Sequence, residues 1–383
     1  MIIPGLPSAF RNPVDVIIND TPPLRESIES LVALPRVAVL IGTGSAERTG
    51  ALARVTELLT PMPFEIIKGI PPEPAQSDVL ATCSKVEQAE ANVILALGGG
   101  SVIDTAKLVT LIFHSDLDLV EVMNRTVTPV RRQLPLLAIP TTAGSGSEVT
   151  PFAVVTNNDT HIKQSLPSPS NYPDMAFLMP ALLRTLPPKV IGDSGIDALA
   201  HALEALWSIH RNPVSTALAE EAAARVFRSL PVFYENPDDD LARFEMAVGS
   251  MIAGLAFSNT FTAACHGLSY PLSSRFHLTH GASCGLTLAA VAGLNSRDVQ
   301  TSFDAIALLA GLPESSIPDS IRALINRVDS LPTLASLNPS EDDLAFVSQN
   351  SFAPLMRNNP VSLDDRTILE LLKSELADSP GSQ

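Results

Sequence analysis

The chain has 383 residues, of which 45% are hydrophobic and 17% charged, with a formal net charge of −16. This composition excludes a disordered chain and favours two folded domains. The acidic balance argues against nucleic acid or an anionic membrane surface as the main partner. Three scattered cysteines are too few for a disulfide framework or a four-thiolate zinc site, so we expect a cytoplasmic protein.

Short apolar runs alternate with helical patterns in the first half of the sequence. We expect strands at Val14–Ile18, Arg36–Ile41, Phe64–Ile67, Asn92–Leu97 and Leu134–Ile139. Asn92–Leu97 is almost entirely apolar, as is typical of a strand that is buried on both faces. Helical patterns follow the second and fourth strands, to about residue 60 and about residue 113. The alternation predicts a mostly parallel sheet with crossover helices.

Helical periodicity replaces the strand signals from about Pro187 onward. We expect helices at Asp197–Ile209, Pro213–Leu230, Asp239–Phe257, Val299–Leu308 and Pro318–Val328. The sequence therefore predicts an α/β domain at 1–182 and an all-helical domain at 183–383. The first eleven residues lack a signal-peptide pattern, and no run approaches the ~20 uninterrupted apolar residues of a membrane span.

Turns rich in glycine and small hydroxyl residues follow three of the expected strands. Gly98-Gly99-Gly100-Ser101 joins a buried strand to a helix, where close backbone approach and free N–H groups favour a diphosphate. The alternative is a tight turn without a ligand. Gly42-Thr43-Gly44-Ser45 and the segment Thr141–Glu148 are further candidates to contact the cofactor, although such loops are also common surface connections.

One carboxylate and three imidazoles form a candidate metal site. Asp197 and His201 are four residues apart in a strongly helical stretch, which puts both side chains on one helix face. His266 and His280 both precede glycine. Together the four side chains can hold a divalent transition metal with room for a substrate oxygen. Taken singly, each histidine is more often structural or on the surface.

Several long runs, in the same order along the chain, resemble the iron-containing (group III) alcohol dehydrogenases. They are Ala96–Lys107, Pro140–Val155, Gly195–Ser208 and Ala256–Thr260, together with the His266/His280 pair. The resemblance extends from about Val14 to about Leu376. It implies a dehydroquinate synthase-like fold, in which the α/β domain is a Rossmann-like dinucleotide-binding domain and the all-helical domain binds metal and substrate. It also implies a homodimer or larger oligomer, a metal cofactor (Fe²⁺ or Zn²⁺) and NAD(H) or NADP(H).

The resemblance also implies roles for individual residues. The implied metal ligands are Asp197, His201, His266 and His280, and the implied diphosphate loop is Gly98, Gly99, Gly100 and Ser101. Further implied cofactor contacts are Asp104, Thr141, Thr142, Ser147, Lys163 and Leu182, beside the candidate Gly42 from the turn described above. The metal would polarise a carbonyl oxygen while the reduced nicotinamide supplies a hydride.

Two departures from the family pattern affect these expectations. Many members carry a histidine four residues after the third metal ligand, where this chain has Tyr270, which we keep as a catalytic candidate. A tyrosine, with an ordinary pKa near ~10, is a poorer proton shuttle at neutral pH. Second, no acidic residue follows the second strand to bind the adenosine ribose, so NADP(H) or dual use is allowed.

The tyrosine, the ALWS and RNPVS segments and the late MRNNPVSL segment look most like the phosphonoacetaldehyde reductase branch of the family. The implied reaction is NAD(P)H-linked reduction of a small aldehyde to its alcohol, here phosphonoacetaldehyde to 2-hydroxyethylphosphonate. A phosphonate needs an anchor, for which Arg275, Asn259, Lys163 and Arg357 are candidates. The alternatives are another short-chain alcohol or diol dehydrogenase, a maleylacetate reductase, or a non-catalytic cofactor-binding protein.

Overall fold

The computed structural model describes residues 9–124, 126–127, 131–158, 163–313, 316–328 and 330–377. The chain divides into two compact units. The α/β unit comprises Asn12–Thr142 and Gly146–Thr185, and the helical unit comprises the chain from Leu186 onward with the residues up to Arg11 and the short segment Ala143–Ser145. The domain boundary expected between residues 182 and 183 stays a prediction.

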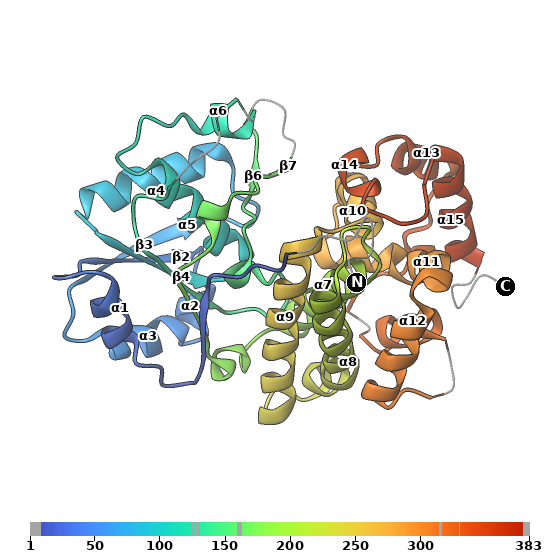
Figure 1. The fold of residues 1–383 in the computed structure, drawn as a ribbon, viewed down its shortest axis with the longest axis horizontal. Helices are drawn as coiled ribbons and strands as arrows, with labels where there is room; N and C mark the ends of the chain where they lie inside the picture. The colour runs from blue at the N-terminus through green and yellow to red at the C-terminus, as the bar shows by residue number, and fades with distance from the viewer. Residues whose placement is uncertain are drawn as a thin grey trace. The chain divides into compact units, whose positions relative to one another are not determined.

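A six-stranded sheet, in which every paired neighbour is parallel, forms the centre of the α/β unit (Figure 1). Its order is β1-β8-β5-β4-β2-β3. The strands are β1 (Asp15–Ile18), β2 (Val37–Gly42), β3 (Phe64–Ile70), β4 (Val93–Gly98), β5 (Leu136–Pro140) and β8 (Met175–Leu178). Two short strands, β6 (Val154–Thr156) and β7 (Lys163–Ser165), form a separate antiparallel pair. The parallel sheet confirms the predicted α/β class.

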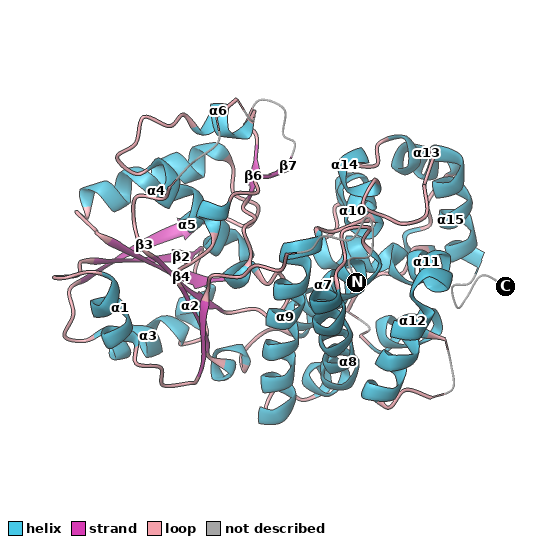
Figure 2. Cartoon of the chain, viewed as in Figure 1, coloured by secondary structure: helices cyan, strands magenta, loops and turns pink. Residues whose placement is uncertain are grey.

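Helices cover both faces of this sheet, as Figure 2 shows. In β4, Ile94 and Ala96 belong to one apolar core, and Val93, Leu95 and Leu97 belong to the other. Successive side chains of a strand point to opposite faces, so a strand covered on both sides is apolar throughout. The first core includes α4 (Gln76–Gln88), α5 (Gly100–Ile112) and α6 (Leu119–Met123). The second includes α1 (Leu24–Leu31), α2 (Ser45–Arg48) and α3 (Ala51–Leu59).

The helical unit is built around α7, which packs against four other helices. Its helices are α7 (Pro188–Trp207), α8 (Pro213–Glu235), α9 (Asp240–Thr260), α10 (Ala264–Phe276), α11 (His280–Ala310), α12 (Ile317–Arg327), α13 (Glu341–Gln349), α14 (Ala353–Met356) and α15 (Asp365–Ala377). Helix α7 begins nine residues before the expected start at Asp197. The segment Ala143–Ser145 lies close to α7, because a Cβ added at Gly144 would come within 2.7 Å of Ser194.

Helices α13, α14 and α15 were not among the expected helices, and two helices close to the predicted metal ligands also differ from the sequence-based expectation. Helix α10 was not expected at all, and α11 begins at His280 rather than at Val299. Val299 has non-helical angles (φ −133°, ψ 19°), so α11 is two helical segments joined across a kink. The expected start marks the second of these segments.

Among the described residues, α9 alone is long and apolar enough to cross a membrane by length and composition. Its most apolar window is 72% buried inside the protein. The helix packs against α7 and α8, as a core helix does.

Candidate functional site

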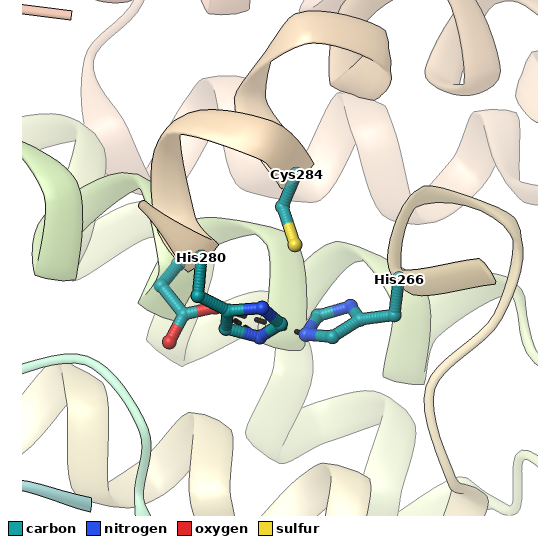
Figure 3. A group of neighbouring side chains, drawn as sticks. His266, His280 and Cys284 are labelled. Atoms are coloured by element: carbon teal, nitrogen blue, oxygen red, sulfur yellow. Dashed lines mark ion pairs between the residues drawn. The ribbon is translucent and has the colours of Figure 1, made fainter. Parts of the chain in front are cut away.

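Four predicted metal ligands come together in the helical unit. Helix α7 presents Asp197 and His201 on one face, α10 carries His266 close to its start, and α11 begins with His280. Asp197 Oδ1 lies 3.7 Å from His266 Nε2 and 3.6 Å from His280 Nε2. The Nε2 atoms of His201 and His266 are 3.1 Å apart. Figure 3 shows the rings of His266 and His280 pointing toward one another.

The rings of His201 and His266 are oriented by partners on their far sides. His201 Nδ1 lies 3.2 Å from the carbonyl oxygen of Gly144, and its ring stacks on Phe257 at 4.1 Å. His266 Nδ1 is hydrogen-bonded to Glu204 Oε2. Because Nδ1 of each ring donates to an oxygen, each Nε2 presents a lone pair, which is the form that binds a metal. Two such lone pairs facing each other at 3.1 Å repel unless a proton or a metal ion lies between them.

The oxygen at the centre of the cluster also fits a metal. Asp197 Oδ1 is buried and has no hydrogen-bond partner among the described residues. Two atoms that bind one ion at about 2.0–2.2 Å lie ~3.0–3.6 Å apart, close to the separations found here. Burial opposes the charge of Asp197, yet the imidazoles, His201 foremost, hold the pKa of its carboxyl below its usual range. A buried carboxylate among imidazoles is the donor set that a divalent transition metal prefers.

Cys284, whose thiol could also bind a metal at this site, was missed by the sequence reasoning. Its thiol lies on α11 one helical turn after His280, and its Sγ is within 4.8 Å of ligand atoms of Asp197, His266 and His280 (Figure 3). The four-residue spacing from His280 is the signal that could have identified it. Burial raises the pKa of the thiol, which keeps it protonated in the metal-free protein. A soft donor at this position favours zinc over iron when it is ionised.

Tyr270 follows His266 by one turn of α10. Its ring lies edge-on to Phe352 at 5.4 Å, and burial raises the pKa of its hydroxyl. The hydroxyl is therefore a hydrogen-bond donor at neutral pH rather than a group that exchanges its proton readily. The catalytic role expected for Tyr270 stays a prediction.

The glycine-rich turn Gly98–Ser101 lies at the carboxyl end of β4 in the α/β unit. A Cβ at Gly98 would meet Val102 Cγ2 at 2.5 Å, and one at Gly99 would meet Thr142 Oγ1 at 3.2 Å. Thr141 donates its backbone N–H to the Gly98 carbonyl at 3.0 Å. Two of the predicted cofactor segments thus meet where adjacent parallel strands end, and the start of α5 offers N–H groups to an anion.

Asp104, Lys107 and Ser147 form a buried network beside this turn. The Lys107 ammonium donates to Ser147 Oγ at 2.8 Å and to the Phe152 carbonyl at 2.6 Å, and lies 3.5 Å from Asp104 Oδ1. Ser147 donates its hydroxyl to Asp104, which also accepts the Val154 N–H. Asp104 and Ser147, both expected to contact the cofactor, are therefore joined to each other, and those contacts stay predictions.

The other predicted cofactor residues lie in different surroundings. Lys163, on β7, forms an ion pair with Glu73, whose backbone N–H donates to Ser101 Oγ at 3.2 Å. Leu182 is buried in an apolar core of the α/β unit. Gly42 ends β2. Glu73 is thus an additional acidic residue at the glycine-rich turn, contributed by the loop after β3, which local spacing did not identify.

Glu148 should make the stability of the α/β unit depend on pH. Burial raises the pKa of its carboxyl from 4.5 to about 7, although Lys107 opposes the shift. The folded state therefore holds this proton more tightly, so its contribution to stability is complete below pH 4.5 and is lost as the pH rises through about 7. Relative to wild type, Glu148→Gln should gain about 3 kcal/mol in free energy of unfolding between these pH values.

Urea unfolding at a series of pH values measures this difference. Glu90→Gln is the matched control, because it makes the same change in charge at an exposed residue of the same unit. Parallel stability curves for wild type and Glu148→Gln would contradict the assignment.

A parallel α/β unit with a glycine-rich turn, joined to a helical unit with one carboxylate and three imidazoles, defines a class of metal- and dinucleotide-dependent oxidoreductases. The profile "Iron-containing alcohol dehydrogenase" matches residues 17–180, and "Fe-containing alcohol dehydrogenase family, C-terminal" matches residues 191–376. The chain belongs to the iron-containing alcohol dehydrogenase family. This confirms the predicted family, the enzyme class and the need for a metal and NAD(P).

Similar proteins act on small alcohols and aldehydes. The chain is 32% identical over 311 residues to the NADPH-dependent butanol dehydrogenase of Clostridium saccharobutylicum, covering 80% of each protein. It is 31% identical over 329 residues to the 1-propanol dehydrogenase PduQ of Salmonella typhimurium, covering 82% of this chain and 85% of that protein. The crystal structure of sulfoacetaldehyde reductase from Bifidobacterium kashiwanohense in complex with NAD⁺ matches with a TM-score of 0.90 and 28% identity, over 97% and 99% of the chains.

Proposed function

We propose that this enzyme reduces a short aldehyde that carries an anionic group, with phosphonoacetaldehyde as the candidate substrate, and that Asp197, His201, His266 and His280 hold its metal. The observation that carries the metal assignment is the buried Asp197 Oδ1, which faces two imidazole nitrogens at 3.6 and 3.7 Å and accepts no hydrogen bond from the described residues. A divalent metal held there supplies Lewis-acid polarisation of a carbonyl oxygen.

The protein's own residues provide orientation and charge. Asp197 contributes one negative charge against three neutral imidazoles, so the loaded centre keeps a net positive charge that favours an alkoxide product. Glu204 and Gly144 fix the tautomers of His266 and His201. In the α/β unit, the N–H groups at the start of α5 bind the cofactor diphosphate, with Thr141 and Thr142 beside them.

The choice of phosphonoacetaldehyde is supported by the three segments that resemble phosphonoacetaldehyde reductases, because they lie together in the helical unit. Ile209, directly after the ALWS segment, donates its N–H to the Asn358 carbonyl at 2.9 Å. Asn358, in the MRNNPVSL segment, donates its side-chain amide to the Thr262 carbonyl at 2.8 Å. Arg211, which begins the RNPVS segment, donates its N–H to the Ser208 carbonyl at 3.0 Å. These segments therefore join close to the start of α10, which carries the proposed ligand His266.

Arg357 is our candidate anchor for the anionic group. It follows Met356, whose side chain packs so closely on Gly267 that a Cβ there would come within 2.5 Å of its sulfur. Arg357 is exposed and forms no ion pair with a described residue. Arg275, an alternative from the sequence, is held by Asp343 at 2.5 Å and lies over the ring of Phe346. An anionic substrate is also consistent with similarity to a sulfoacetaldehyde reductase.

An aldehyde panel tests both parts of the proposal. Phosphonoacetaldehyde, sulfoacetaldehyde and propanal would be assayed with NADH and NADPH after loading with Fe²⁺ or Zn²⁺. We expect the anionic aldehydes to have the higher kcat/KM, and Arg357→Gln to raise KM for them by ~10-fold or more without changing KM for propanal, because a charge-assisted contact contributes ~1.5–3 kcal/mol.

Arg366→Gln, at an exposed arginine on α15, is the matched control for the loss of one positive charge. A preference for propanal would remove the anionic substrate and leave a short-chain alcohol dehydrogenase. No activity with any aldehyde after metal loading would favour a non-catalytic protein.

We propose that the enzyme uses both NAD(H) and NADP(H). We also propose that it is a cytoplasmic homodimer or larger oligomer. The turn after β2 carries Gly44, and a Cβ at Gly44 would lie 3.0 Å from Arg48 Nη1 and 3.6 Å from Glu47 Oε2. An arginine near this turn accommodates a 2′-phosphate. One relative is named as NADPH-dependent and one similar structure holds NAD⁺. The same panel separates the two nucleotides.

A further inference from the structure

We propose that two carboxylates of α7, Glu204 and Asp193, are positioning residues that cap α10 and α11 from outside those helices and thereby fix His266 and His280 at the metal. This inference rests on the proposed metal centre and extends it. Helix α7 would then supply two ligands directly and set the position of the other two.

Helix α10 begins without a cap of its own. Its N-cap residue is Ala263, which has no polar side chain. Glu204 takes this role, because its Oε1 accepts the backbone N–H groups of Cys265 at 2.6 Å and His266 at 3.2 Å. These are the second and third residues of the helix, whose N–H groups an N-cap side chain ordinarily satisfies. The other oxygen of Glu204 bonds to His266 Nδ1, so one buried carboxylate fixes both the backbone and the ring of His266.

Helix α11 repeats this arrangement with a different carboxylate. Its N-cap residue, Thr279, makes no capping bond and instead donates its hydroxyl to Asp193 Oδ1. The same oxygen accepts the N–H of Ala282, the third residue of α11, at 2.8 Å. The backbones are also close, because a Cβ at Gly281 would come within 2.0 Å of the Asp193 carbonyl oxygen. The first residue of α11, His280, is thus held at a fixed distance from α7.

The spacing along α7 relates these contacts to the metal. Asp193 precedes Asp197 by four residues, and Glu204 follows His201 by three, so all four lie along one side of the helix. Loss of either cap would release a helix start that carries a ligand, although no ligand is itself removed. Groups that hold metal ligands in place typically contribute ~10–100-fold to metal affinity.

Cobalt(II) binding to the full-length, metal-free protein tests this proposal, followed by the visible absorption of the bound ion. Asp193→Ala should raise the Co²⁺ Kd by ~10–100-fold. Asp239→Ala is the matched control, because Asp239 caps α9 by accepting the Ala242 N–H at the same 2.8 Å but holds no ligand. Both variants should lower the melting temperature of the metal-free protein, but only Asp193→Ala should weaken Co²⁺ binding and alter its spectrum.

The amide variants Asp193→Asn and Glu204→Gln distinguish the effect of holding the helix starts in place from the effect of the carboxylate charge. Asp193→Asn keeps an oxygen for Ala282 and Thr279 and should restore most of the Co²⁺ affinity, whereas Glu204→Gln should weaken affinity through the ring of His266. Equal affinities for Asp193→Ala and Asp239→Ala, or Asp193→Asn as weak as Asp193→Ala, would overturn the positioning role. If wild type bound no Co²⁺, or His280→Ala bound it unchanged, the proposed metal centre itself would fail.

Discussion

Replacing Asp197 with asparagine should abolish stoichiometric metal binding and lower kcat/KM by about 10³-fold or more. The substitution keeps the shape of the side chain but removes the only negative charge among the four proposed ligands. Metal polarisation of a carbonyl contributes several kcal/mol to the transition state, and each 1.36 kcal/mol is a factor of ten in rate. Elemental analysis of the purified variant and steady-state kinetics on the best aldehyde of the panel measure the two losses.

The matched control is Asp304→Asn, which makes the same change at an exposed position of α11 where the carboxylate accepts a bond from Gln300. Its metal content and rate should equal those of wild type. An Asp197→Asn enzyme that retained one metal per chain and more than a tenth of its rate would contradict the ligand assignment. Circular dichroism at matched concentration checks that both variants are folded.

The sheet could be predicted from sequence because its signal is local. A strand covered on both faces is apolar throughout, and β2, β4 and β5 all have this pattern. β8 was not expected, since it has only four residues and lies between Pro173 and Pro180. A strand this short forms because it pairs with β1 and β5, and a local sequence pattern does not reveal that pairing.

The helices that carry His266 and His280 illustrate the opposite case. Ordinary helix starts show a serine, threonine, asparagine or aspartate cap, as Asn212 does for α8. Helix α10 has Ala263 at this position and contains Pro271, so no start signal is present in its sequence. Its cap is Glu204, about 60 residues earlier in the chain. The ligand residues could be predicted from their chemistry, whereas the structure that holds them depends on contacts distant in sequence.

Replacing Lys107 with methionine should destabilise the α/β unit by about 3–5 kcal/mol, because it leaves buried carboxylates without their cation. Lys107 is fully buried and donates to Ser147 Oγ, Thr150 Oγ1 and the Phe152 carbonyl, at 2.8, 3.3 and 2.6 Å. Methionine fills similar space but donates no hydrogen bond. Hydrogen exchange of the α5 backbone amides, measured with increasing urea, reports the loss of stability of the α/β unit.

The network predicts how a second substitution should combine with this one. Asp104 lies 3.5 Å from the Lys107 ammonium, so Lys107→Met with Asp104→Asn should lose less stability than the sum of the single variants. Lys85→Met, at an exposed lysine of α4, should change stability by less than ~0.5 kcal/mol. Strict additivity of the two buried substitutions would mean that Lys107 and Asp104 act independently. The segment from Ser147 to Val154 would then be held to α5 by packing rather than by charge.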